Sequence, residues 1–189
     1  MSLFLVAAVP FLGALLPGLM NSAGRQACAG VTFMVTLVAF VGLLTNAPAV
    51  FAGEVVQAGV DWMPILGLNV NLMLDALGFF FALLILGIGL LIIAYGRFYL
   101  AREDNMGEFF TYLLLFQGAM VGIVLSDNIL LLLIFWELTS LSSFLLIGYW
   151  KHLPEGRQGA RMALTVTGVG AAIAWGNQKW KGNCADFVK

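Results

Sequence analysis

The sequence predicts an all-α integral membrane protein: a polytopic helix bundle of five transmembrane helices plus a partial sixth, with a short external β-hairpin between helices two and three. Three observations predict this class. The 189 residues are 61% hydrophobic and only 10% charged, whereas soluble domains have about 25% charged residues. Their mean hydropathy is +0.98. The apolar residues also gather in runs of about twenty, long enough for a helix to cross a bilayer core of about 30 Å.

Five of these runs meet the length requirement, given some tolerance for tilt. The predicted spans are Leu3–Met20, Ala27–Thr45, Leu72–Tyr95, Phe109–Leu125 and Ile129–Tyr149. The first run lacks the basic amino-terminal region of a signal peptide, so it is interpreted as a span. A further stretch, Gly159–Trp175, is shorter and rich in Gly and Thr, and it is interpreted as the partial sixth span.

Residues 46–71, between the second and third spans, are punctuated by Pro and Gly. Alternation through Val60, Trp62, Leu68 and Val70 predicts the hairpin on the external face. Asp75 is expected at the start of the third helix. Asp127 is interpreted as the residue that caps the fifth span.

The basic residues fall in alternate loops, which predicts the orientation in the membrane. They are Arg25, Arg97, Arg102, Lys151, Arg157 and Arg161. Residues 46–71 and 126–128 contain no Lys or Arg. By the positive-inside rule, the amino terminus is expected outside, and the loops at 21–26, 96–108 and 150–158 are expected in the cytoplasm. The predicted location is the cell inner (plasma) membrane, with several passes.

Glu137 is the one charged residue between Asn128 and Trp150. It lies about 14 Å from Asn128 along a helix, close to the bilayer midplane. A carboxylate there costs several kcal/mol unless it is neutral, paired or in contact with water, and such residues usually mark an ion or proton path. The alternative is a buried acid that ties two helices together. Every Lys and Arg from Arg25 to Arg161 is expected at a cytoplasmic end, so a basic partner is expected from outside these residues.

Residues around Glu137 have expected supporting roles. Trp136 is interpreted as packing between helices and shielding the acid. Thr139, Ser140 and Ser143, with Ser142, form a hydroxyl patch that could bond a carboxylate or water, or could be only a packing seam. His152, beside Lys151, is interpreted as a juxtamembrane residue, with proton entry as a minor alternative.

Other functions are excluded by composition and motifs. A net charge of −1 argues against a nucleic-acid partner. Two cysteines provide neither a disulfide framework nor metal-ligand spacing, and P-loop, HExxH and CxxC motifs are absent from the sequence. No enzyme, cofactor or metal is therefore expected. From the residues alone, the expected partners are the lipid bilayer and the protons or other ions that Glu137 would serve.

Residues 126–150, SDNILLLLIFWELTSLSSFLLIGYW, resemble the fifth helix of the antiporter-like membrane subunits shared by Mrp-type multisubunit cation/proton antiporters and respiratory complex I. Residues 72–100 and 106–128 resemble the two preceding helices. The resemblance covers roughly Leu3 to Gly170, and FWELTSLSSFLLIG is most similar to the A-type subunits of the Mrp-type antiporters. The resemblance implies that Glu137 is the family's fifth-helix glutamate, which pairs with a lysine on a later broken helix during proton translocation. It also implies several partner subunits in a membrane complex.

The expected function is therefore that of the amino-terminal segment of a membrane subunit in a multisubunit Na⁺ (monovalent cation)/proton antiporter, contributing the glutamate of a proton path. One alternative is a proton-pumping, chain 5-type subunit of NADH-quinone oxidoreductase or a related complex. Another is a truncated structural fragment without transport of its own. A third is an unrelated small-solute carrier, which the scarcity of polar residues in the spans disfavours.

The resemblance also predicts the division of the chain. Family members have about fourteen or more helices, so residues 1–170 are expected to be the amino-terminal part of the transmembrane domain. The apolar pattern then decays into AWGNQKWKGNCADFVK. Residues 171–189 are interpreted as an aberrant polar tail from a truncation or frameshift. A natural short form with a re-entrant sixth segment is the alternative.

Overall fold

The computed structural model describes residues 3–20, 24–63, 68–100, 105–149, 162 and 165–170. Within them the chain is mostly helical, with one small antiparallel sheet, as the sequence predicts. The elements are, in chain order, α1 (Leu3–Leu19), α2 (Arg25–Leu44), the short α3 (Ala47–Phe51), β1 (Val56–Met63), β2 (Leu68–Leu74), α4 (Ala76–Tyr99), α5 (Met106–Leu125) and α6 (Ile129–Ile147). Residues 165–170 are also helical.

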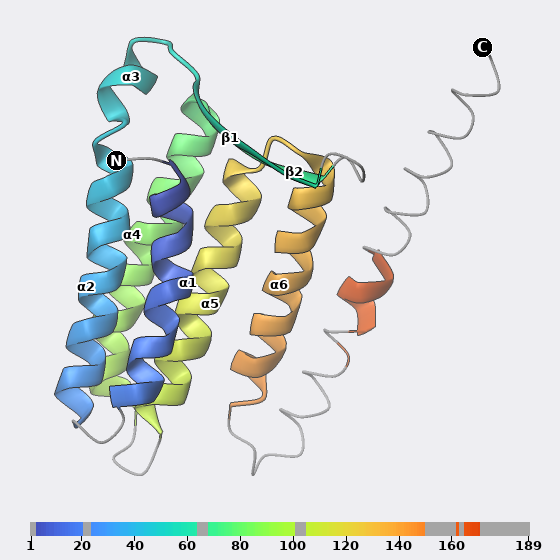
Figure 1. Cartoon of the computed structure of the whole chain (residues 1–189). Coiled ribbons are helices and arrows are strands. Elements are labelled where there is room, and N and C mark those ends of the chain that lie inside the picture. Colours follow the sequence, from blue (N-terminus) through green and yellow to red (C-terminus); the bar gives the residue numbers. More distant parts are fainter. Residues whose placement is uncertain are drawn as a thin grey trace, which may run out of the picture.

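The long helices lie side by side and run alternately up and down, and the β-hairpin crosses one end of the bundle (Figure 1). Helix α5 is central, because it contacts α1, α2, α4 and α6. Helix α6 lies at the edge and packs mainly against α5, with a smaller contact to β2. This edge position decides how the candidate site is presented.

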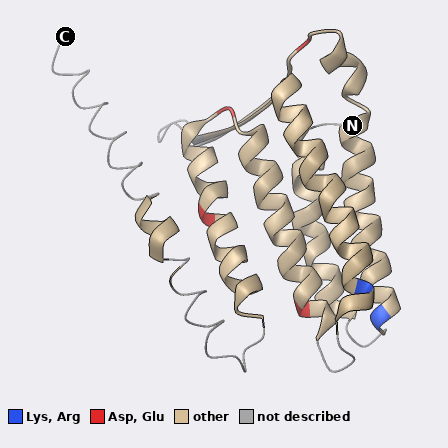
Figure 2. Cartoon of the chain, turned by 180° about the vertical axis from the view of Figure 1, so that it is seen from behind, with Lys and Arg blue, Asp and Glu red and all other residues tan. Residues whose placement is uncertain are grey.

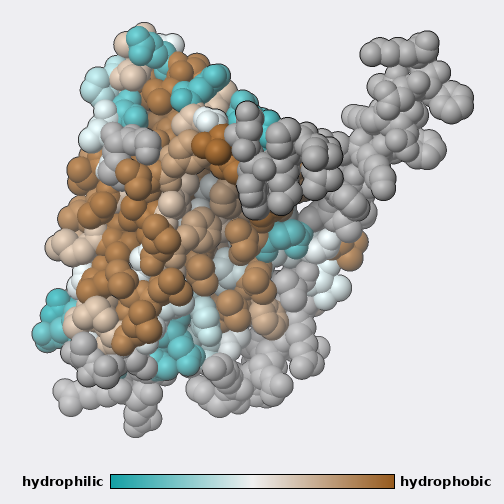
Figure 3. All heavy atoms as spheres, viewed as in Figure 1, coloured by the Kyte–Doolittle hydropathy of each residue, from teal (hydrophilic) through white to brown (hydrophobic). Residues whose placement is uncertain are grey.

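Four stretches of helix in the described residues are long and apolar enough to cross a membrane: Arg25–Phe51, Ala76–Tyr99, Met106–Leu125 and Ile129–Ile147. Helix α1 is equally apolar but has 17 residues. Figure 3 shows hydrophobic side chains over the middle of the bundle, with hydrophilic ones gathered near its two ends. The chain is a multi-pass membrane protein. Most of the predicted sixth stretch, Gly159–Trp175, lies outside the described residues, as does the tail from residue 171.

The predicted hairpin is confirmed, but the predicted start of the third span is wrong. Residues Leu72–Leu74 belong to β2 and pair with β1, where Val56 lies opposite Leu74. The helix begins only at Ala76, because the Asp75 carboxylate accepts a hydrogen bond from the Gly78 N–H at 2.7 Å and caps it. The expected helix-start role of Asp75 is therefore confirmed. Helix α3 is an element that the sequence analysis did not anticipate.

The predicted cap of the fifth span is also corrected, since the capping side chain is that of Asn128 rather than Asp127. The Asn128 Oδ1 accepts the Leu130 N–H at 2.9 Å, and its Nδ2 donates to the Asn69 carbonyl at 3.4 Å. Asp127 contributes its backbone N–H, which donates to the Asn71 carbonyl at 3.0 Å. The start of α6 is thus tied to the hairpin through Asn128 and through the backbone of Asp127.

This geometry predicts unequal effects for two neighbouring substitutions. Asn128→Ala removes the cap and the contact with Asn69, so it should lower the free energy of unfolding by about 1 kcal/mol. Asp127→Ala keeps the backbone bond to Asn71 and should cost clearly less. Thermal unfolding in detergent micelles, followed by circular dichroism, measures both. An equal or larger loss for Asp127→Ala would contradict the capping assignment.

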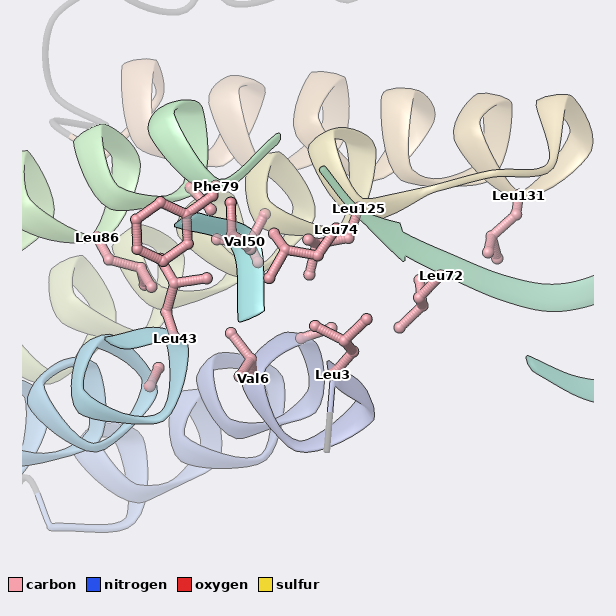
Figure 4. Packing of buried hydrophobic residues seen from close by; sticks show 14 residues of the cluster. Leu3, Val6, Leu43, Val50, Leu72, Leu74, Phe79, Leu86, Leu125 and Leu131 are labelled. Carbon is pink, nitrogen blue, oxygen red and sulfur yellow. The ribbon is translucent and has the colours of Figure 1, made fainter. Parts of the chain in front are cut away.

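The buried side chains form two clusters, one at each end of the bundle. The cluster near the hairpin joins α1, α2, α3, α4, α5, α6 and β2, and includes Leu3, Leu43, Leu74, Phe79 and Leu125 (Figure 4). The other cluster includes Cys28, Ile93 and Phe110. The two clusters hold the helices at fixed depths relative to one another, and hence fix the height of α6 beside α5.

A buried polar link joins three helices between these clusters. The Thr36 hydroxyl of α2 donates to the Gln117 Oε1 of α5 at 3.2 Å, and the Gln117 Nε2 donates to the Ile85 carbonyl of α4 at 3.4 Å. Gly89 provides the room, because a Cβ there would collide with the Gln117 amide. Polar groups inside a membrane bundle need such partners, since lipid offers none.

Candidate functional site

Glu137 lies half-way along α6, the last long helix of the bundle. It is the ninth of the helix's 19 residues, so it lies about 12 Å from the first residue at about 1.5 Å per residue. The rest of α6 is apolar apart from its hydroxyl residues. Figure 2 shows this acidic position within a helix, whereas the other charged positions lie near the ends of the bundle. The position half-way along the helix agrees with the sequence analysis, and its depth near the bilayer midplane stays a prediction.

The Glu137 side chain is exposed on the side of α6 that faces away from the described bundle. Ile134, Trp136, Leu138 and Leu141 are exposed as well, by 40%, 46%, 37% and 48%. Only three side chains of α6 are buried, namely Leu131, Ser140 and Ser142. Helix α6 therefore packs along one narrow side, and its carboxylate lies on a wide apolar face that no described residue covers.

The hydroxyl residues beside Glu137 bond to their own helix. The Thr139 and Ser140 hydroxyls both donate to the Trp136 carbonyl, at 2.6 and 3.1 Å, and the Ser142 hydroxyl donates to the Leu138 carbonyl at 2.7 Å. Ser140 and Ser142 are buried and Ser143 is half-buried. This arrangement fits a packing seam for Ser140 and Ser142. Thr139 retains a hydroxyl oxygen that can accept a further hydrogen bond on the open side.

Within the described part of the chain, no side chain forms a hydrogen bond or ion pair with the Glu137 carboxylate. The described cations are Arg25, the first residue of α2, and Arg97, in the last turn of α4. Trp136, expected to pack between helices, is 46% exposed here, so any shielding of the acid must come from residues beyond those described. His152 lies outside the described residues. The described residues also contain no cluster that could hold a metal ion.

Two glycines of α5 allow close packing, Gly122 against α6 and Gly118 against α1, a feature that the sequence analysis missed. A Cβ on Gly122 would lie 2.5 Å from the ring of Phe135 in α6, and a Cβ on Gly118 would lie 3.1 Å from the ring of Phe11. The Phe11 and Phe135 rings stack with centroids 6.1 Å apart. The signal was present in the sequence, because Gly118 and Gly122 form the GxxxG spacing that lets membrane helices approach closely.

Comparison with known proteins identifies two matching families. Residues 62–110 match the family described as "NADH-Ubiquinone oxidoreductase (complex I), chain 5 N-terminus". Residues 126–174, which include Glu137, match "NADH:quinone oxidoreductase/Mrp antiporter, TM". Over these two ranges the chain is similar to the antiporter-like membrane subunits, in agreement with the resemblance found in its sequence.

Relatives and solved structures agree with this assignment. The chain is 54% identical over 97 residues to a probable K⁺/H⁺ antiporter A/B subunit of Rhizobium meliloti (strain 1021), a match that covers 51% of this chain and 10% of the relative. It is 52% identical over 94 residues to the A1 subunit of a Na⁺/H⁺ antiporter of Staphylococcus aureus (strain JH9), covering 50% of this chain and 12% of the relative. The Mrp complex from Dietzia sp. DQ12-45-1b superposes with a TM-score of 0.73 at 34% identity, covering 90% of this chain and 18% of that one.

A second solved structure shares the fold alone. The membrane-bound sulfane sulfur reductase, an archaeal respiratory membrane complex, superposes with a TM-score of 0.77 at 20% identity, covering 90% of this chain and 34% of that one. The same helical arrangement thus occurs in an antiporter complex and in a respiratory complex. The sequence matches span 10% and 12% of the length of the two curated relatives, so the activity of a whole antiporter protein is a matter for proposal.

Proposed function

We propose that this chain forms part of a membrane subunit of a multisubunit monovalent cation/proton antiporter, in which Glu137 belongs to the proton path. The observation that carries the proposal is the carboxylate at mid-depth on an open face of α6, in a chain that is 34% identical to a chain of an Mrp complex over 90% of its length. Relatives named as Na⁺/H⁺ and K⁺/H⁺ antiporter subunits support the transport of a monovalent cation.

In a membrane, the Glu137 carboxylate on the exposed face of α6 requires a neighbour other than lipid. A carboxylate facing lipid at the bilayer centre costs about 2.5–3.5 kcal/mol even on the scale that gives the smallest penalty. Further helices, from the same subunit or from a partner subunit, would remove that cost if they brought a basic side chain or a file of water to Glu137. Such an arrangement lets the acid take up a proton and release it when the neighbouring charge moves.

The basic residues support one orientation for this proposal. Arg25 and Arg97 lie at the end of the bundle away from the hairpin (Figure 2). By the positive-inside rule, that end faces the cytoplasm, while the amino terminus and the hairpin face outward in the plasma membrane. Helix α6 then runs inward, and a proton at Glu137 is about equally far from both surfaces.

Proton flux in vesicles tests the proposal. The assembled complex that contains this segment would be placed in vesicles with an imposed pH gradient, which a pH-sensitive dye reports. Adding Na⁺ or K⁺ should collapse the gradient, without any electron donor. A gradient that responds to an electron donor and ignores both cations would instead establish the complex I-type alternative. This chain reconstituted alone should give no exchange, because among the described residues no basic side chain lies beside Glu137.

A further inference from the structure

A second feature of interest lies at the basic end of the bundle, away from Glu137. A hollow of about 280 Å³ opens between α2 and α4. Its lining is apolar and comes from α2 and α4, including Ala29, Gly30, Met34, Ile93 and Phe98. Arg97 lines it too. The hollow is therefore apolar along its length, with one guanidinium in the last turn of α4.

The last turns of α4, next to this hollow, carry side chains typical of a lipid–water interface. Tyr95 and Tyr99 are 65% and 61% exposed and stack with ring centroids 5.4 Å apart. Phe98 is 82% exposed, and the Arg97 guanidinium lies 5.5 Å from its ring centroid. Exposed tyrosines of this kind are typical of the headgroup level, where an arginine can extend its charge toward water. We therefore place the outer end of the hollow at headgroup depth and its inner part in the hydrocarbon.

The Arg97 guanidinium has no acidic partner among the described residues. In the ranges that the structure describes, no carboxylate forms an ion pair with it. The nearest acid in sequence within those ranges, Glu108, accepts a hydrogen bond from Asn105 at 3.0 Å. The other described arginine, Arg25, donates to the Leu100 carbonyl at 2.7 Å. A ligand with an apolar tail and an anionic head would fill the hollow with its tail and pair its head with the guanidinium.

We propose that this hollow between α2 and α4 binds an anionic phospholipid, with the acyl chain along its apolar lining and the headgroup phosphate at Arg97. Basic pockets between transmembrane helices are known to take anionic headgroups in this way. A larger groove of about 410 Å³ between α4 and α5 has no charged residue in its lining. It should hold acyl chains without regard to the headgroup. The inference does not depend on the proposed transport function.

Native mass spectrometry of the 189-residue chain in detergent tests the proposal. The probes are phosphatidylglycerol and phosphatidylcholine with identical acyl chains. One basic residue near the membrane surface predicts binding of phosphatidylglycerol about fivefold tighter than that of phosphatidylcholine. Arg97→Gln should abolish this preference and leave the binding common to both lipids. Arg97→Lys, which retains the charge, should keep the preference.

A second pair of variants tests the hollow itself. A Cβ at Gly30 meets nothing within 4 Å, so Gly30→Leu can fill the hollow without a clash, whereas Gly30→Ala leaves it largely open. Gly30→Leu should abolish the preferential binding of phosphatidylglycerol, and Gly30→Ala should retain it. Circular dichroism confirms that each variant is folded, and if Arg97→Gln is not, the Gly30 pair decides. Equal affinities for the two lipids in the unsubstituted chain, or a preference that survives Arg97→Gln or Gly30→Leu, would overturn the proposal.

Discussion

Glu137→Gln, introduced into the assembled complex that contains this segment, is expected to lower cation/proton exchange on the order of a hundredfold, the lower end of what a positioned proton-transferring group contributes. The amide has nearly the same shape and can keep hydrogen bonds, but it cannot take up and release a proton in the physiological range. Helix packing should not change, because the side chain is exposed on α6 and touches no partner in the described bundle. The measurement is dye-reported pH-gradient collapse after addition of Na⁺ or K⁺.

Two control variants separate this effect from assembly and from general loss of charge. Glu54→Gln removes one carboxylate from an exposed position before β1 and should leave exchange unchanged. Glu137→Asp keeps an acid but shortens it, so it should retain part of the activity. The amount of assembled complex, followed by blue native electrophoresis, should be the same for all three variants. Normal exchange by Glu137→Gln would refute the proton-path role, whereas lost assembly would point to the alternative of an acid that ties helices together.

The positions of the helices could be predicted from the sequence because the length of an apolar run is what a bilayer selects. Their ends could not. Residues Leu72–Leu74 are apolar, and a short apolar run does not distinguish a buried strand from the start of a helix. The cap at Asn128 could not be distinguished from one at Asp127, since both residue types accept a hydrogen bond from a backbone N–H. In each case a tertiary contact with the hairpin decides the boundary.

The position of Glu137 half-way along its helix could be predicted from the sequence, but the direction of its side chain could not. Helix α6 has Leu, Ile or Phe on every side, so no apolar stripe indicates which side meets α5. The contact is set instead by Gly122, which creates room on α5 for the Phe135 ring of α6. Once Phe135 of α6 lies against Gly122, Glu137, two residues further on, is about 200° away around the helix and must lie on the opposite side.

Gly122→Val is therefore expected to destabilise the 189-residue chain by about 1–3 kcal/mol, the usual cost of overpacking a close contact. Its Cβ alone would lie 2.5 Å from the Phe135 ring, so α6 must shift or the ring must leave. Thermal unfolding in micelles gives the free energy change. Gly30→Val is the matched control, because its Cβ meets nothing within 4 Å. A loss no larger than that of the control would show that Gly122 does not seat α6.

Phe135→Ala provides the second arm of a double-mutant cycle. Alone it should destabilise the chain by removing the ring from between Gly122 and Phe11. Combined with Gly122→Val, it should recover stability relative to the sum of the two single changes, because the valine then fills space that the ring has left.

In the assembled complex, the same variants should change the rate of cation/proton exchange in the same pattern. Gly122→Val turns or lifts α6 and displaces Glu137, whereas the double variant returns the carboxylate toward its place. Adding Phe135→Ala to Glu137→Gln should restore nothing, because what is missing there is the proton-binding group itself and not its position.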